Sequence, residues 1–307
     1  MLTNNSISKS TRKNPLQVLK RKLVPYAYLS PTIILMTVLM LIPIVMVIIY
    51  SLMDNVVMNK NPVLVGIENY VEILTDSIFL ETISNTLYFT VMSVIFHFVI
   101  GLAFAMLLNV KILHSATKSF FRVVYVLPWV FTATIIAILW RLMLNPNGIV
   151  NYILNTLNII SSNIEWFSSR KFALHAITYL NIWAGYPFFM ISLLAGLQGI
   201  PSDLYEAATI DGANNIKSFI YVTIPQLKPI IISMAMLDFI WTMQQFPLVW
   251  MTTGGGPIHA TEMLSTYTYK LAFSSYKFSL ASASAVIILI LSMCVALFYV
   301  KNQKARD

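Results

Sequence analysis

The chain has 307 residues, of which 58% are apolar and 10% are charged, and its mean hydropathy is +0.75. A soluble globular domain of this length needs far fewer apolar residues for its core, so the composition excludes that class and indicates an integral membrane protein. The formal net charge of +8 comes from basic residues that flank apolar stretches, which argues against a nucleic-acid partner. The single cysteine, Cys294, excludes an intrachain disulfide.

The first 25 residues are expected to form a cytoplasmic tail. Residues 1–14 are polar and have the composition of a disordered segment. Residues 16–23 (LQVLKRKL) mix basic and apolar side chains, which is typical of a helix lying on anionic lipid or of a short helix docked under the membrane domain. Both interpretations are open. The apolar run that follows is longer than the core of a signal peptide, so we expect it to be retained as a span.

Six stretches are apolar enough and long enough to cross a bilayer, because a spanning helix needs about 20 residues. They define a predicted transmembrane domain over residues 26–300, followed by a cytoplasmic tail at 301–307. The predicted spans are 26–53, 82–108, 120–144, 172–197, 229–251 and 279–300. With the N-terminus inside, the inner segments carry most of the 20 Lys and Arg residues. This agrees with the enrichment of positive residues on the cytoplasmic side of membrane spans. We therefore predict an all-α, multi-pass protein of a cytoplasmic membrane with both termini cytoplasmic.

Residues 198–228 form a polar loop on the predicted cytoplasmic side, between the fourth and fifth spans. The loop contains a possible helix-capping pair, a turn and a second cap, formed by Asp203 with Glu206, by Asp211-Gly212, and by Asn214 or Asn215. We expect two short helices joined by a kink at the membrane surface.

The fifth predicted span carries polar and aromatic side chains spaced at i, i+3, i+4 and i+7, namely Asp238, Trp241, Thr242 and Gln245. This spacing places them on one helix face. A carboxylate inside a span is costly unless it faces water or a partner. The face is therefore either part of a solute pathway, where carboxylate, amide and aromatic groups suit sugar hydroxyls and rings, or a set of interhelical hydrogen bonds. We favour the pathway.

The 198–228 loop resembles the EAA loop of permease subunits in binding-protein-dependent ABC importers. The resemblance is carried by the strings Glu206-Ala207-Ala208, Asp211-Gly212-Ala213 and Ile224-Pro225. In that family this loop forms the coupling helix that docks on the ATPase subunit. The resemblance thus implies an ATPase-coupling role for Glu206, Ala207, Ala208, Asp211, Gly212, Ala213 and Pro225.

Three further stretches resemble the carbohydrate branch of these permeases, which contains the larger maltose-system permease and the glycerol-phosphate permease. They are residues 65–70 (VGIENY), 193–197 (LLAGL) and 253–257 (TGGGP). The similarity covers residues 25–300, but this chain has six spans and lacks the two extra N-terminal helices and the large outer insertion of the maltose permease. The resemblance implies a sugar-contacting face formed by Asp238, Trp241, Thr242, Gln245, Asn181, Ala184, Gly185 and Phe188. An alternative role for Gly185 is to loosen its helix.

The function implied by this resemblance is uptake of a carbohydrate or related polyol through a type I ABC importer fold. The implied partners are a second homologous permease, two copies of an ABC ATPase, an extracytoplasmic solute-binding protein and membrane lipid. The chain has no G-x-x-x-x-G-K-[ST] string, so we expect ATP hydrolysis on a separate chain and neither enzymatic activity nor a cofactor here.

Catalytic and metal-binding constellations are not expected either, because the four histidines are scattered and are interpreted as packing or interfacial residues. Two alternative functions are open: a secondary transporter driven by an ion gradient, with Asp238 as its coupling site, or an ABC permease for a solute other than a sugar.

Overall fold

A computed structural model describes residues 15–110 and 114–304, with side chains described for 24–110 and 114–301. Every regular element in these ranges is a helix, which confirms the all-α prediction. The expectations for residues 1–14 and 305–307 lie outside the described residues. Residues 16–23 form the first turns of a helix that continues into the first span, rather than a separate short helix.

The helices are joined by connections of varied length, the longest at residues 52–67 and 157–172, and include two π-helical turns. In chain order they are α1 (Pro15–Met36), a π turn (Thr37–Leu41), α2 (Ile42–Ser51), α3 (Glu68–Thr75), α4 (Ser77–Asn109), α5 (Ser115–Val130), α6 (Ala133–Met143), α7 (Ile149–Thr156), α8 (Ala173–Gln198), α9 (Ser202–Ile210), α10 (Asn215–Ser218), a second π turn (Phe219–Thr223), α11 (Ile224–Met243), α12 (Pro247–Thr252), α13 (Leu264–Phe273) and α14 (Phe278–Lys304).

Five helical stretches in the described ranges are long and apolar enough to cross a membrane on their own. They are Val24–Ser51, Ser77–Asn109, Ala173–Gln198, Asn215–Met243 and Phe278–Lys301. A sixth crossing requires α5 and α6 together, and these two helices meet at an angle of 97°.

The prediction of one continuous third span over 120–144 is therefore wrong. Phe131 and Thr132 adopt extended backbone between α5 and α6, and Pro128 lies in the last turn of α5. Proline cannot donate a main-chain hydrogen bond, which weakens the helix at this point. The Thr132 hydroxyl accepts a hydrogen bond from the Ile135 N–H at 3.4 Å, so α6 starts with a cap of its own.

Both π turns lie next to a proline that follows them. The first covers Leu39, four residues before Pro43, and the second covers Tyr221, four residues before Pro225. The residue four before a proline loses its helical hydrogen bond and meets the proline ring. A wider turn at that position lets each span continue through its proline.

The fifth span begins earlier than predicted. Helix runs from Asn215 through α11 to Met243, whereas the predicted limits were 229 and 251. Consequently, the predicted second short helix of the 198–228 loop is the start of this span. The last predicted residues form the separate helix α12 instead.

The core forms where α4 packs along α8. Phe89 of α4 and Leu180 of α8 are buried in one cluster, and Phe189 of α8 is buried in another. Gly101 makes this approach possible, because a Cβ at that position would lie only 2.6 Å from the Cβ of Phe189. This packed pair is the frame to which α5, α6 and α11 attach.

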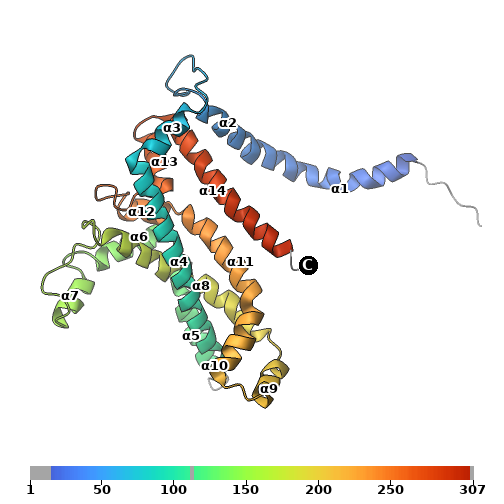
Figure 1. Cartoon of the computed structure of the whole chain (residues 1–307), viewed down its shortest axis with the longest axis vertical. Coiled ribbons are helices and arrows are strands. Elements are labelled where there is room, and N and C mark those ends of the chain that lie inside the picture. Colours follow the sequence, from blue (N-terminus) through green and yellow to red (C-terminus); the bar gives the residue numbers. More distant parts are fainter. Residues whose placement is uncertain (1–14, 111–113, 305–307) are drawn as a thin grey trace, which may run out of the picture.

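Figure 1 shows how the ends of the molecule differ. Helices α3, α12 and α13 gather at one end, whereas α9 and α10 lie at the other. Helix α1 extends away from the bundle, and its described side chains are mostly exposed apolar groups. The fold therefore separates the outer loops from the predicted coupling segment.

Candidate functional site

A cavity of about 270 Å³ lies where α4, α5, α6, α8 and α11 meet within the membrane domain. It collects all of the predicted pathway residues except Phe188. Those lining it are Asn181, Ala184, Gly185, Asp238, Trp241, Thr242 and Gln245. The helical periodicity of α8 and α11 turns these side chains toward the same space.

Gln245 reaches the cavity by a different route from the one predicted. Helix α11 ends at Met243, so Gln245 belongs to the turn before α12 rather than to the helix face. Its amide nitrogen lies 3.5 Å from the Asn181 side-chain oxygen. The turn thus brings Gln245 into the cavity lining beside Asn181.

Asp238 is the buried carboxylate of this site, with 7% of its surface exposed. One carboxylate oxygen accepts a hydrogen bond from the Thr242 hydroxyl at 3.2 Å, and the other lies 2.7 Å from Nδ1 of His97. Burial of a carboxyl group is tolerated in proteins when its oxygens are hydrogen-bonded, as here.

His97 was missed as a site residue, and the expectation that it is only a packing residue is incomplete. It lies on α4 with 2% of its surface exposed, and its Nε2 is 2.9 Å from the main-chain carbonyl oxygen of Asn181. Its position inside a span could have identified it from the sequence, because an ionisable side chain within the membrane usually has a function. The histidine therefore links three spans through Asn181 and Asp238.

Gly185 makes room for this histidine. A Cβ at Gly185 would overlap the imidazole ring of His97. Helix α8 continues through this position to Gln198, so the glycine acts through the space that it leaves open. That role differs from the helix-loosening alternative.

Phe188 lies behind the cavity. Its ring packs 5.4 Å from the ring of Trp241 and 6.3 Å from that of Trp129. Trp129 and Pro128, which line the cavity from α5, and Phe131 could not be predicted because they are positioned by the bend between α5 and α6. Trp241 and Trp129 are 59% and 53% exposed, so one side of the site is uncovered in the described chain.

The predicted coupling segment is built around α9, which buries none of its side chains within the described chain. Glu206 and Ala207 are exposed on this helix and Ala208 is half-buried. The Tyr205 hydroxyl lies 2.9 Å from that of Thr223 in the π turn, which ties α9 to the start of the fifth span.

A left-handed glycine ends this helix, as the Asp211-Gly212 turn predicted. Gly212 has φ of +77° and donates its N–H to Thr209, while Ala213 donates to the carbonyl of Ala208 at 2.8 Å. Asp211 and Gly212 are both exposed. Glycine adopts this conformation without steric cost.

Two capping predictions have different outcomes. Asn214 does cap the next helix, because its side-chain oxygen accepts the N–H of Lys217 at 2.9 Å. The predicted pair of Asp203 and Glu206 is wrong, since α9 begins after Pro201 and no side chain caps it. The proline fixes the backbone at the helix start. Pro225 is exposed at the start of α11.

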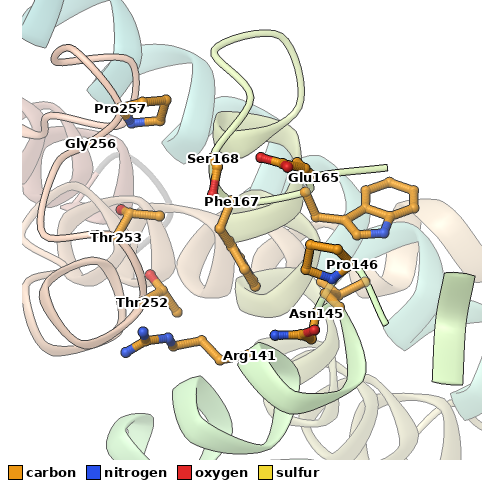
Figure 2. A pocket seen from close by; sticks show the side chains of 12 residues that line it. Arg141, Asn145, Pro146, Glu165, Phe167, Ser168, Thr252, Thr253, Gly256 and Pro257 are labelled. Carbon is orange, nitrogen blue, oxygen red and sulfur yellow. The ribbon is translucent and has the colours of Figure 1, made fainter. Parts of the chain in front are cut away.

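The outer end carries a separate pocket of about 390 Å³. Figure 2 shows the segment with Thr253, Gly256 and Pro257 on one side and Pro146 and Glu165 on the other. Both polar and apolar side chains line it. The Gly-Gly-Gly-Pro stretch noted in the sequence is thus a wall of an outer pocket.

This outer loop is held by a buried acid. The Glu262 carboxylate, 1% exposed, pairs with Lys270 and lies 3.2 Å from Nδ1 of His259. Gly255 has φ of +92°, and a Cβ there would meet that carboxylate. The glycine lets the loop pass directly over the acid.

A family model, described as "Binding-protein-dependent transport system inner membrane component", matches residues 75–306. The trehalose/maltose transport system permease protein MalF of Thermococcus litoralis is 32% identical over 285 residues, covering 92% of this chain and 94% of the relative. The probable ABC transporter permease protein YurN of Bacillus subtilis is 30% identical over 283 residues, covering 92% and 96%. The sulfoquinovosyl glycerol transport system permease protein SmoG of Agrobacterium fabrum is 32% identical over 288 residues, covering 93% and 92%.

A solved structure agrees with the fold. A chain in the crystal structure of a bacterial ABC transporter involved in the import of the acidic polysaccharide alginate has a TM-score of 0.80 and 22% identity. The similarity covers 95% of this chain and 98% of that chain. Together, the matched segment, the relatives and the membrane-spanning helices show that this chain belongs to the binding-protein-dependent transport system inner membrane components, the permease subunits of ABC importers.

Proposed function

We propose that this permease subunit carries a carbohydrate or related polyol through the cavity around Asp238, powered by a separate ATPase. The observation that carries the proposal is the convergence of seven predicted pathway residues on that one cavity. Relatives named for trehalose/maltose and for sulfoquinovosyl glycerol transport support a glycoside as the solute. Family membership favours this function over the ion-gradient-driven alternative.

The lining suits a hydroxyl-rich solute. Trp241 offers a ring face, Thr242 and Gln245 offer hydroxyl and amide groups, and the Asn181 side-chain nitrogen is buried without a hydrogen-bond partner among the described residues. A buried donor without a partner is costly. A solute hydroxyl entering the cavity would satisfy it. Ala184 and Gly185 add small surfaces that leave space for a ring.

The partners that we propose are a second homologous permease, two ABC ATPase subunits and an extracytoplasmic solute-binding protein. The exposed face of α9 supports ATPase docking, because Leu204 and Ile210 are 38% and 87% exposed beside Glu206. Exposed apolar side chains of this kind mark interaction surfaces. The outer pocket lies at the opposite end, on the side from which a binding protein would deliver its solute.

One continuous helix connects the end of the α9 segment with the cavity. Residues Asn215–Met243 are helical without a break; the helix begins just after the Gly212 turn and carries Asp238 near its other end. At about 1.5 Å per residue, such a helix transmits a displacement across the whole membrane. ATP-driven movement of α9 would therefore rotate the Asp238 face directly.

The test compares variants of the coupling segment in proteoliposomes that contain the whole transporter. Glu206→Lys should reverse the charge offered to the ATPase, and Gly212→Pro should block the left-handed turn, since proline is restricted to negative φ. Both variants should insert and assemble but lose uptake per ATP hydrolysed. Asp203→Lys, on the same helix but outside the Glu-Ala-Ala string, is the matched control.

Normal uptake by both variants would contradict the coupling role. The partners are checked first, by gentle solubilisation of the tagged chain and mass spectrometry of what co-purifies. Recovery of an ATPase and a second permease is expected. A chain recovered alone would contradict the proposed assembly.

A further inference from the structure

The hydrogen bonds around His97 determine which of its nitrogens carries a proton. Nε2 lies 2.9 Å from the main-chain carbonyl oxygen of Asn181, and a carbonyl oxygen only accepts hydrogen bonds. Nε2 must therefore be protonated. A neutral imidazole has one N–H, so in that state Nδ1 would have a lone pair directed at Asp238.

Asp238 requires a second proton between the two side chains. Its carboxylate oxygen lies 2.7 Å from Nδ1 of His97, a distance at which two lone pairs would repel. One proton must lie on either Nδ1 or the carboxyl group. With the proton on Nε2, the two side chains then carry either an imidazolium and a carboxylate or a neutral imidazole and a carboxylic acid. The net charge of the pair is zero in both cases.

No other titratable side chain lines the cavity among the described residues. The remaining lining groups are amides, hydroxyls, aromatic rings and aliphatic side chains. The elements packed around the pair present Asn181 and Gly185 from α8 and Thr242 from α11, none of which is charged. Among the described residues, the ionisable groups that line the cavity are thus those of the His97–Asp238 pair.

We propose that His97 is a specificity-determining positioning residue, which holds Asp238 in a net-neutral pair and so makes the pathway select uncharged polyhydroxylated solutes over cationic ones. The inference rests on the proposed function of the cavity. A lone carboxylate in a low-dielectric site attracts cations strongly, whereas a neutral pair presents only hydrogen-bonding atoms. Gly185 also contributes to the pair, because it leaves the space that the His97 imidazole occupies.

Solid-state NMR of the assembled transporter in lipid nanodiscs tests the pair directly. This chain has four histidines, so ring ¹⁵N labelling of this subunit alone gives few signals, and the His97→Gln variant assigns the one in the cavity. Asp carboxyl ¹³C labelling reports the protonation of Asp238, with Asp238→Asn as its assignment variant. The expected result is a protonated Nε2 together with one further proton shared by the pair. A bare Nε2 beside an ionised Asp238 would overturn the proposal.

Uptake by the same transporter in proteoliposomes tests the selectivity. The probes are radiolabelled trehalose, which is uncharged, and glucosamine, which is cationic. His97→Gln removes the ring nitrogen that shares a proton with Asp238 and leaves a lone carboxyl group free to ionise, so trehalose uptake should fall by about tenfold or more, while glucosamine competes more strongly. The double variant His97→Gln/Asp238→Asn is neutral again and should regain part of the trehalose uptake that His97→Gln alone loses.

The two proposals fail in different ways. A purely structural role for His97 predicts that the double variant is at least as defective as either single variant, which would overturn the inference. Preferential glucosamine uptake by the unaltered transporter would overturn it as well. Absence of trehalose uptake by an intact transporter with a neutral pair in the NMR spectra would count against the proposed solute, leaving the pair established.

Discussion

Gly185 illustrates how an absent side chain determines the chemistry of a neighbour. The imidazole of His97 occupies the space that a Cβ at Gly185 would fill, and from there it reaches both Asn181 and Asp238. The polar pair therefore depends on close approach of α4 and α8. A larger residue at position 185 would therefore act by displacing the His97 side chain rather than by changing the path of α8.

We expect Gly185→Ala to lower both stability and uptake. Overpacking in a buried site costs about 1 to 3 kcal/mol, and displacement of His97 would leave Asp238 without its partner. Thermal unfolding of the purified transporter in detergent, together with uptake in proteoliposomes, measures both effects. Gly199→Ala is the matched control, because a Cβ there meets no atom closer than 3.4 Å. Equal behaviour of the two variants would contradict the packing role.

At the scale of single residues, the sequence predicted one side of the cavity well. Asp238, Trp241 and Thr242 share a helix face because their spacing matches the helical period, which is a local property. The partnership of Asp238 with His97 is not local, since 141 residues separate them. Periodicity could flag each as an ionisable residue in a span but could not show that they meet.

The helices themselves show the effect of prolines within spans. Pro43 and Pro225 each follow a π turn that contains the residue four positions before them. Hydropathy detects such a span but is insensitive to a widened turn or a bend. The same limit explains the third span, where hydropathy predicted one helix and the extended residues Phe131 and Thr132 divide it in two. The local geometry decides which side chains line the cavity.

We expect Pro225→Ala to uncouple the ATPase partly from transport. Without the proline ring, the Phe219–Thr223 turn is free to tighten to an ordinary α-helix, which changes the rotation of α11 relative to α9. The variant should keep or gain thermal stability, since proline in a helix interior costs about 3 kcal/mol. The ratio of uptake to ATP hydrolysis measures the coupling.

Pro229→Ala provides the comparison for this prediction. Pro229 also lies inside α11, but the residue four positions before it is Pro225, within the helix rather than in a π turn. This variant should retain more of the coupling ratio than Pro225→Ala. An unchanged ratio in Pro225→Ala would show that the π turn has no part in coupling.

Taken as a whole, the molecule has two ends whose sidedness depends on the bent pair α5–α6. If the pair crosses the membrane, residues 144–172 lie outside and α9 lies inside, as the distribution of Lys and Arg requires. Helix α8 starts beside the start of α4, where Arg170 pairs with Glu81 at 2.8 Å and Nδ1 of His175 lies 2.7 Å from the Tyr88 hydroxyl, so α5 and α6 together return the chain to that end. A total of six crossings in the described ranges therefore requires α5 and α6, which meet at 97°, to form one span together.

We expect the pair to cross the membrane. A reporter inserted after Asn163 should be active as alkaline phosphatase, which works outside the cytoplasm, and one inserted after Gly212 should fluoresce as green fluorescent protein, which requires the inside. The exchanged fusions, each reporter at the other site, are the controls. Phosphatase activity at Gly212 would show that the third segment is a re-entrant loop.

The uncovered side of the cavity has a genetic consequence. Trp241 and Trp129 border the proposed solute site yet remain more than half exposed in the described chain, which fits a wall supplied by the proposed second permease. Substrate preference is then inherited jointly from two genes rather than encoded in one. Selection for growth on a new solute should recover mutations in either gene, and a defect introduced at Trp241 should be suppressible by changes in the companion permease.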